Sequence, residues 1–189
     1  MSVSTPPPPL RVTKTVALVG LMGAGKTAVG KRLAQRLGVA FYDADAEIEQ
    51  AANATIEEIF EAHGEAFFRA REREVIRRLL GNPPHVLATG GGAFMDPETR
   101  ALLRERAITV WIRADLDLLL SRVMRRANRP LLKRGEPRAV LEQLMAERHP
   151  VYAEADITVD SIDGPADATL GRLVEALQRH VGVAAGAAP

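Results

Sequence analysis

Cysteine is absent from this sequence, and neither sign of charge prevails in it. The 189 residues include no cysteine, 25 lysines and arginines, and 24 aspartates and glutamates. The lack of cysteine excludes disulfides, thiolate catalysis and cysteine-ligated metals, and it fits a reducing compartment, so the cytoplasm is the expected location. The balanced charge gives no global reason to expect a nucleic acid, an anionic membrane or another polyelectrolyte as partner.

Long apolar runs are also missing. The longest apolar stretches are core strands of about six residues, whereas a membrane-spanning helix needs roughly 20. Residues 1–13 are rich in serine, threonine and proline, lack the apolar stretch of a secretion signal, and are expected to form a disordered or polyproline-like arm. With 47% hydrophobic residues, the chain predicts one compact domain over 14–180, followed by a flexible tail over 181–189.

Short β-branched runs alternate with helical patterns along the chain. This alternation predicts an α/β fold of three layers, in which a mainly parallel sheet of about five strands carries helices on both faces. The expected strands cover 15–20, 39–42, 85–89, 107–112 and 155–159. The expected helices cover 27–37, 46–51, 55–62, 65–80, 97–104, 116–126, 139–148 and 165–180.

A glycine-rich turn follows the first expected strand. Gly20, Gly25, Lys26 and Thr27 form the pattern G-x-x-x-x-G-K-T, placed between a strand and a helix. Glycines let the backbone wrap a phosphate, the lysine reaches the β and γ phosphates, and the threonine hydroxyl ligates Mg²⁺. An ordinary glycine turn with a solvated lysine is the alternative, which the strand and helix context disfavours. The predicted nucleotide contacts of this P-loop are Gly23, Ala24, Gly25, Lys26, Thr27 and Ala28.

Two carboxylates stand where the second expected strand ends. Asp43 and Asp45 occur in the stretch FYDAD, at the sheet edge where ligands of open α/β folds bind. Beside a triphosphate they can serve Mg²⁺ and hold or deprotonate a hydroxyl acceptor. The alternative is that one of them only caps the helix that begins near Ala46.

Three successive glycines follow the third expected strand. In VLATGGG, a buried strand opens into Gly90, Gly91 and Gly92. Such a run costs chain entropy, but it permits close approach of the backbone to a γ-phosphate or a small polar acceptor. A flexible turn at a strand end is the alternative.

Positive charge gathers between residues 122 and 138. This segment is expected to be a lid over the triphosphate, because it holds seven basic residues and the single acid Glu136. It contains no aromatic residue for base stacking, which argues against nucleic acid binding. A solvated face without function is the stronger alternative for most of these arginines, Arg129 excepted. The basic residues are Arg122, Arg125, Arg126, Arg129, Lys133, Arg134 and Arg138.

The motifs occur in the order seen in shikimate kinases, so the chain resembles that family over roughly residues 15–177. The shared segments are GLMGAGKT, the pair Asp43 and Asp45, Phe68-Arg69, Thr89 to Gly92, Asn128 to Leu132, and Arg148-His149-Pro150 with Tyr152. The resemblance implies the strand order 2-3-1-4-5, a substrate-binding segment over about 45–80 and a lid over about 124–138.

The resemblance also assigns roles at the acceptor. It implies that Asp45 binds the shikimate hydroxyls, as base or as holder, and that Asp43 lies near the metal. Arg69 and Arg148 would grip the substrate carboxylate, for which planar arginines are suited, while Gly90, Gly91 and Gly92 supply backbone contacts. If the resemblance is set aside, Arg69 is interpreted as an ordinary ion-pair residue on a charged helix. Arg148 is then interpreted as a cation in the last turn of a helix, with Pro150 as its stop signal.

At the nucleotide, the resemblance places Arg129 of the lid on the transferring phosphoryl group, Arg122 near adenine and Pro165 on the other side of the base. The implied reaction moves the γ-phosphoryl of ATP to the 3-hydroxyl of shikimate, with Mg²⁺ as cofactor, Lys26, Asp45 and Arg129 as catalytic residues, and a monomer as the expected state. The alternatives are another P-loop small-molecule kinase, acting on gluconate or a nucleoside monophosphate, and a non-catalytic nucleotide-binding module.

Overall fold

A single parallel sheet organises the chain. The computed structural model describes residues 11–125 and 136–186. Its strands are β1 (Thr15–Val19), β2 (Phe41–Asp43), β3 (Val86–Ala88), β4 (Ala107–Arg113) and β5 (Ile157–Asp160). All neighbours pair in parallel, and the spatial order is β2-β3-β1-β4-β5. The strand order implied by the family resemblance is therefore confirmed.

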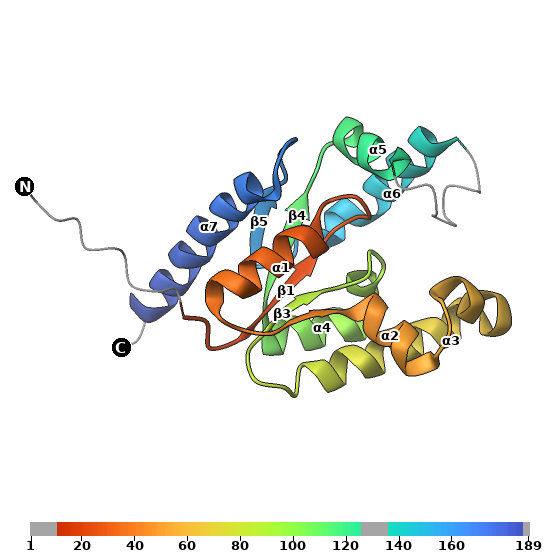
Figure 1. Cartoon of the computed structure of the whole chain (residues 1–189), viewed down its shortest axis with the longest axis horizontal. Helices are drawn as coiled ribbons and strands as arrows, with labels where there is room; N and C mark the ends of the chain where they lie inside the picture. The colour runs from red at the N-terminus through yellow and green to blue at the C-terminus, as the bar shows by residue number, and fades with distance from the viewer. Residues whose placement is uncertain (1–10, 126–135, 187–189) are drawn as a thin grey trace, which may run out of the picture.

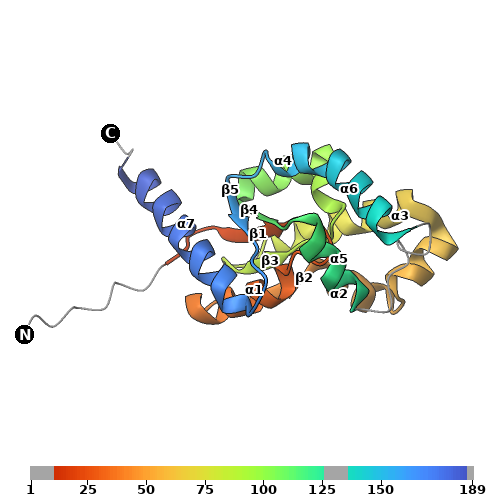
Figure 2. The same cartoon turned by 90° about the horizontal axis from the view of Figure 1, so that it is seen from above.

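Helices cover both faces of this sheet. They are α1 (Lys26–Leu37), α2 (Ala44–Ala52), α3 (Ile56–Leu79), α4 (Pro97–Arg106), α5 (Leu116–Met124), α6 (Pro137–Tyr152) and α7 (Ala166–Gly186), with a 3₁₀ turn η1 (Ala93–Met95) before α4. Seen from above, α1 and α7 lie together on one side of the strands and α4 lies on the other (Figures 1 and 2). The three-layer α/β architecture expected from the sequence is confirmed.

Burial explains the composition of the strands. Every residue of β1 is buried, and β4 is buried over its whole length except Arg113. Central parallel strands are covered on both faces, so continuous apolar runs suit them. By contrast, Ile157 and Val159 of the edge strand β5 are buried while the residues that follow each of them are exposed.

The substrate-binding segment predicted over 45–80 forms α2 and α3. Thr55 and Glu58 start α3 with a capping box, in which the Glu58 carboxylate accepts from the Thr55 N–H at 2.7 Å. The sequence predicts two helices here, over 55–62 and 65–80, and the backbone of α3 breaks between them at Gly64, whose φ of 79° and ψ of 176° are not helical. Glycine permits this break because its backbone tolerates positive φ.

Two helix ends differ from the sequence prediction. Helix α6 continues through Pro150 to the buried Tyr152, because a proline in the last turn costs few hydrogen bonds and the tyrosine packs in the core. Helix α7 extends to Gly186, beyond the expected end at residue 180. Within the described ranges, no helix is long and apolar enough to cross a bilayer.

Candidate active site

The P-loop connects β1 to α1 with a backbone that requires glycine. Gly20, Gly23 and Gly25 have φ values of 141°, 79° and 101°. A Cβ added at Gly20 would lie 2.6 Å from the Ile112 carbonyl oxygen, so no side chain fits there. The loop can therefore follow a phosphate closely and end at the N-terminus of α1, where amide groups favour anions.

Lys26 and Thr27 open α1 and face the cleft. The Lys26 ammonium donates to the carbonyl oxygens of Gly20 at 2.6 Å and Leu21 at 2.9 Å, so it lies over the loop. The Thr27 hydroxyl donates to Asp43 Oδ2 at 2.8 Å. The P-loop and the end of β2 thus meet at one point, as the sequence predicts.

Asp43 makes contacts in two directions. Its Oδ1 accepts from the backbone N–H groups of Asp45 at 3.2 Å and Ala46 at 3.5 Å, which caps α2. Its Oδ2 faces the Thr27 hydroxyl. The capping alternative is therefore correct for Asp43, but capping uses only one of its two oxygens.

The Thr27 and Asp43 oxygens fit a magnesium site that relies on few protein ligands. No group of three or more His, Cys, Asp or Glu side chains able to hold a metal occurs among residues 11–125 and 136–186. Mg²⁺ does not need one, because it usually keeps several waters and takes one or two carboxylates together with substrate phosphates. One hydroxyl and one carboxylate oxygen within 2.8 Å of each other suit that coordination.

Asp45 is a carboxylate whose charge is disfavoured by its surroundings. Burial raises its pKa, and the negative charge of Asp43 raises it further, while Lys26 and Arg69 oppose the shift. Such a group is more basic than an ordinary aspartate. Asp45 is therefore suited to accept a hydrogen bond or a proton from a hydroxyl group.

Side chains crowd the glycine turn, which we define as Gly90–Gly92. A Cβ added at Gly90 would lie 2.7 Å from Asp45 Oδ1 and 2.8 Å from Glu72 Oε1, and one at Gly91 would lie 3.2 Å from Arg148 Nη1. These glycines leave room for charged groups that come from three different helices. The structure thus favours close approach over the alternative of a merely flexible turn.

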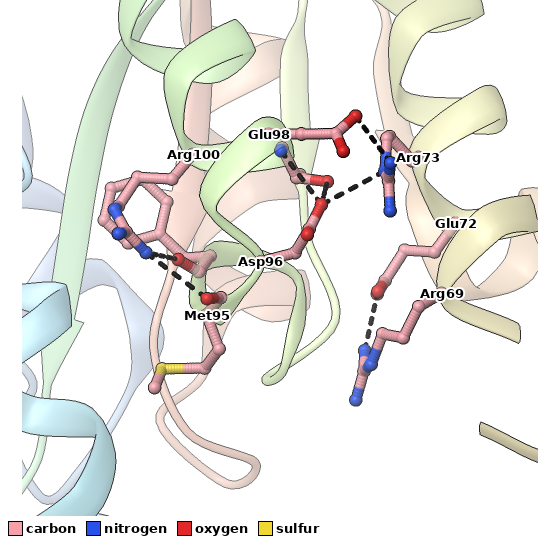
Figure 3. Close-up of polar contacts among 9 residues, drawn as sticks. Arg69, Glu72, Arg73, Met95, Asp96, Glu98 and Arg100 are labelled. Carbon is pink, nitrogen blue, oxygen red and sulfur yellow. Dashed lines mark hydrogen bonds and ion pairs between the residues drawn. The ribbon is translucent and has the colours of Figure 1, made fainter. Parts of the chain in front are cut away.

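Arg69 lies against the third glycine of this turn. A Cβ at Gly92 would collide with the Arg69 guanidinium group. Arg69 Nη1 donates to Glu72 Oε2 at 2.6 Å, and Nη2 lies 3.5 Å from the exposed Glu65. The ion-pair alternative is therefore also satisfied, yet the same guanidinium remains at the glycine turn, where Figure 3 shows it beside Glu72.

Glu72 is a buried charged residue beside the glycine turn that the sequence patterns did not single out. It is 1% exposed, and its Oε1 has no hydrogen-bond partner among the described residues. Burial raises its pKa, against the lowering effect of Arg69. Glu72 lies on the buried face of α3 with Phe68 and Val75, so a charged residue within an apolar helical stripe was the available signal.

Tyr152 is a second residue with a contact that the sequence did not predict. Its side chain is fully buried, and its hydroxyl donates to the Gly91 carbonyl oxygen. Burial raises the pKa of Tyr152, while the neighbouring Arg148 lowers it. Tyr152 thereby joins the end of α6, which carries Arg148, to the glycine turn.

Arg122 braces the P-loop from α5. Its Nη1 donates to the carbonyl oxygens of Gly23 and Ala24 at 3.2 Å and to Ser161 Oγ at 2.9 Å, and its Nη2 donates to the Ile162 carbonyl at 2.7 Å. It therefore connects the P-loop to the segment after β5. This places Arg122 at the end of the cleft where the adenine contacts are predicted.

One cavity of about 460 Å³ links the P-loop and Arg122 to Asp45 and Gly91, whereas Arg69 and Arg148 are not among its lining residues. It runs from the segment after β5, past the P-loop, to Asp45 and Gly91. Pro165 is exposed and is not among the lining residues, although Gly164 and Ala166 are, so its adenine contact stays a prediction. Arg129 and most of the predicted lid lie outside the described residues. Further lining residues are Lys26, Thr27, Arg32, Asp43, Thr89, Arg122, Arg125, Ser161 and Thr169.

Comparison with known sequences gives a consistent result. The family model described as shikimate kinase matches residues 22–178. A shikimate kinase of Paramagnetospirillum magneticum is 56% identical over 167 residues, which are 88% of this chain and 86% of the relative. A shikimate kinase of Mesorhizobium japonicum is 50% identical over 171 residues, covering 90% of this chain and 84% of the relative.

Solved structures are similar as well. A shikimate kinase from Acinetobacter baumannii in complex with shikimate superimposes with a TM-score of 0.84 at 40% identity, over 90% of this chain and 94% of that one. A gluconokinase from Sinorhizobium meliloti gives a TM-score of 0.62 at 18% identity, over 95% of this chain and 100% of that one. At that identity the second similarity shows a shared fold alone.

Proposed function

Because this chain belongs to the shikimate kinase family, we propose that it transfers the γ-phosphoryl group of ATP to the 3-hydroxyl of shikimate, giving shikimate 3-phosphate and ADP. One observation carries this proposal. Asp45, Arg69 and Arg148, from three separate helices, converge on the glycine turn, and the cavity beside Asp45 and Gly91 continues to the P-loop.

The acceptor would be held at both of its polar ends. Arg69 and Arg148 offer two planar guanidinium groups over neighbouring glycines, which suits bidentate recognition of the shikimate carboxylate. Asp45, with its raised pKa, would accept a hydrogen bond from a hydroxyl group. Backbone groups of the glycine turn would complete the contacts, and Glu72 would hold Arg69 in place at 2.6 Å.

Phosphoryl transfer depends mainly on positioning and charge. Its transition state is loose, so neutralisation of the phosphoryl oxygens outweighs the strength of the base. Lys26 lies over the P-loop and would move onto the phosphates, and Arg129 of the lid would add a second cation. Asp45 therefore acts chiefly as a holder of the acceptor hydroxyl, and it takes the proton as the new P–O bond forms.

Magnesium would be held by Thr27 and Asp43, whose side-chain oxygens are 2.8 Å apart. When bound, Mg²⁺ would neutralise part of the negative charge of the triphosphate. Nucleotide contacts would come from Gly23 to Ala28, with Arg122 and Pro165 near the base. A monomeric enzyme in the cytoplasm stays our prediction for this chain.

A coupled assay of ADP release tests the proposed function. The purified protein is given Mg²⁺ and ATP with shikimate, gluconate or AMP in turn. We expect rapid ADP release with shikimate and only background release with the other two acceptors. Acceptor-dependent release with gluconate or AMP would assign another small-molecule kinase, and nucleotide binding without acceptor-dependent release would assign a non-catalytic module.

A further inference from the structure

The glycine turn receives little support from the sheet. Beyond Thr89, whose N–H and hydroxyl both donate to the Leu18 carbonyl, the described backbone–backbone hydrogen bonds of the turn are local, and its one long-range hydrogen bond comes from the Tyr152 hydroxyl to the Gly91 carbonyl. Ala93 N–H donates to Gly90 O and Met95 N–H donates to Gly92 O, each at 3.1 Å. Side chains must therefore fix the turn relative to the helices that carry the acceptor contacts.

Helix α4 supplies part of that support. Asp96 follows η1 and caps α4, because its Oδ2 accepts from Thr99 N–H at 3.0 Å and from Thr99 Oγ1 at 2.7 Å. Arg100 donates to the carbonyl oxygens of Phe94 at 2.9 Å and Met95 at 3.3 Å. The segment directly after the glycine turn is thus tied to the first turn of α4, as Figure 3 shows.

Helix α3 reaches the same segment through Arg73. This arginine lies one helical turn after Arg69, so both project from the same side of α3. Its Nη1 donates to Glu98 Oε2 at 2.5 Å, while its Nε lies 3.2 Å from Asp96 Oδ2 in an ion pair that makes no hydrogen bond (Figure 3). Arg69 therefore lies against the glycine turn while Arg73 holds the segment that leaves it.

The Arg73–Asp96 pair is more shielded than a typical surface ion pair. Its side chains are 26% and 19% exposed, whereas the Arg71–Glu74 pair on the same helix is 53% and 58% exposed. Exposed pairs contribute little because water and salt screen them, and shielded pairs are screened less. The hydrogen bonds that Asp96 accepts as the N-cap of α4 also hold its carboxylate in place beside Arg73.

We propose that Arg73 is a positioning residue for the acceptor: by holding Asp96, it fixes the glycine turn relative to the part of α3 that carries Arg69 and Glu72. Arg73 itself touches no substrate. The inference rests on the proposed function, because the positioned groups are those assigned to shikimate. Without Arg73, the glycine turn and α3 move slightly apart. Binding of the acceptor is then weaker, while nucleotide binding at the P-loop is unaffected.

The test compares Arg73→Gln with Arg71→Gln in steady-state kinetics. Both substitutions remove one arginine of α3. Arg73 pairs with Asp96 and Glu98, whereas Arg71, within the described part of the chain, pairs only with the exposed Glu74 and packs on Phe67. We expect Arg73→Gln to raise the KM for shikimate about fivefold, with the KM for ATP unchanged, because a shielded pair is worth more than an exposed one. For Arg71→Gln we expect both KM values to match the wild type.

A double-mutant cycle with Asp96→Asn isolates the pair. Asparagine keeps an oxygen that can cap α4, so this variant removes the charge and spares the cap. We expect each single variant to raise the KM for shikimate, and the double variant to raise it little more than either, because both changes break the same interaction. Additive effects would show that Arg73 and Asp96 act separately and would overturn the inference.

Other outcomes are equally decisive. An unchanged KM for shikimate in Arg73→Gln would overturn the inference. This holds even if the midpoint of thermal unfolding falls, because Arg73 would then contribute to stability alone. Equal effects of Arg73→Gln and Arg71→Gln would overturn it too. A wild-type protein without shikimate-dependent ADP release would instead overturn the proposed function, and this inference with it.

Discussion

Single side chains in the cleft contact several partners at once. Asp43 caps α2 with one oxygen and faces Thr27 with the other, and Arg122 donates to two P-loop carbonyls and to the segment after β5. A substitution at such a residue therefore removes more than one interaction. The clearest tests at the residue scale use groups whose chemical role is distinct from their structural contacts.

Lys26 is one such group. We expect Lys26→Ala to lower kcat by about 10²–10³-fold or more, because it removes a cation that stabilises charge on the transferring phosphoryl group. Lys31→Ala, on the exposed side of the same helix, is the matched control and should leave kcat unchanged. The coupled ADP assay measures both, and a wild-type rate for Lys26→Ala would contradict the P-loop assignment.

Asp45 provides a second test. Asp45→Asn keeps the shape of the side chain but removes its charge and its ability to take a proton. We expect turnover to fall by about 10²-fold with ATP affinity nearly intact, because the acceptor hydroxyl is no longer held correctly. Nucleotide titration measures the affinity and the ADP assay measures the turnover. Undiminished turnover would remove Asp45 from the mechanism.

At the scale of elements, the glycine turn and α3 form the acceptor end of the cleft. Gly92 has helical dihedral angles, with φ −91° and ψ −12°, so alanine suits its backbone. The obstacle is the Arg69 guanidinium, which a new methyl group would displace. Space, and not backbone strain, therefore requires glycine at this position.

Gly92→Ala is expected to fold and to raise the KM for shikimate roughly tenfold, because it displaces a charge-assisted contact to the substrate carboxylate. Gly171→Ala is the control, since a Cβ there meets nothing within 4 Å and alanine favours the helix α7. We expect that control to keep wild-type kinetics and to unfold at a slightly higher temperature. Unaltered kinetics in Gly92→Ala would mean that Arg69 does not bind the acceptor from this position.

Helices and strands could be predicted from the sequence where the local residue pattern matches the burial that neighbouring elements impose. The P-loop follows from glycine spacing between a strand and a helix, and β1 and β4 follow from continuous apolar runs. The break at Gly64 follows from the gap between the two helical patterns 55–62 and 65–80. The role of Glu72 was missed because an i,i+3 charge pair on a helix looks the same whether it is buried or solvated.

At the scale of the whole molecule, His85 connects stability to pH. It is fully buried directly before β3, where Nδ1 lies 2.9 Å from the Pro83 carbonyl and 3.2 Å from Thr15 Oγ1, and its ring makes an edge contact with the ring of Tyr42. Burial lowers the pKa of His85 below its usual value, against a smaller raising effect of the Pro83 carbonyl. The folded protein therefore binds a proton at His85 less readily than the unfolded chain does.

The sign of the effect follows by linkage. As pH falls through the unfolded pKa of histidine, near 6.5, the unfolded chain takes up the proton first and folding stability decreases. Above that pH the contribution of His85 is fully present. We expect His85→Phe to flatten the fall in the free energy of unfolding between about pH 7 and 5, measured by urea denaturation. A parallel pH dependence in the variant and the wild type would contradict this.

The fold as a whole was more predictable than the site. Alternating strands and helices indicate a parallel three-layer sheet, and the family resemblance supplies the strand order. Contacts between distant segments, such as the Tyr152 hydroxyl on Gly91 or Arg73 on Asp96, depend on how helices dock, which no local pattern encodes. Family motifs indicated the residues Arg69 and Arg148, and the structure adds what surrounds them.

The most direct test of the account follows the phosphorus atom. The protein is incubated with Mg²⁺, shikimate and ATP labelled at the γ-phosphoryl group, and the products are examined by phosphorus NMR and mass spectrometry. The account predicts that the label appears in a shikimate monophosphate esterified at the 3-hydroxyl, with one ADP formed for each ester. Label found only in inorganic phosphate, or left in ATP, would contradict it.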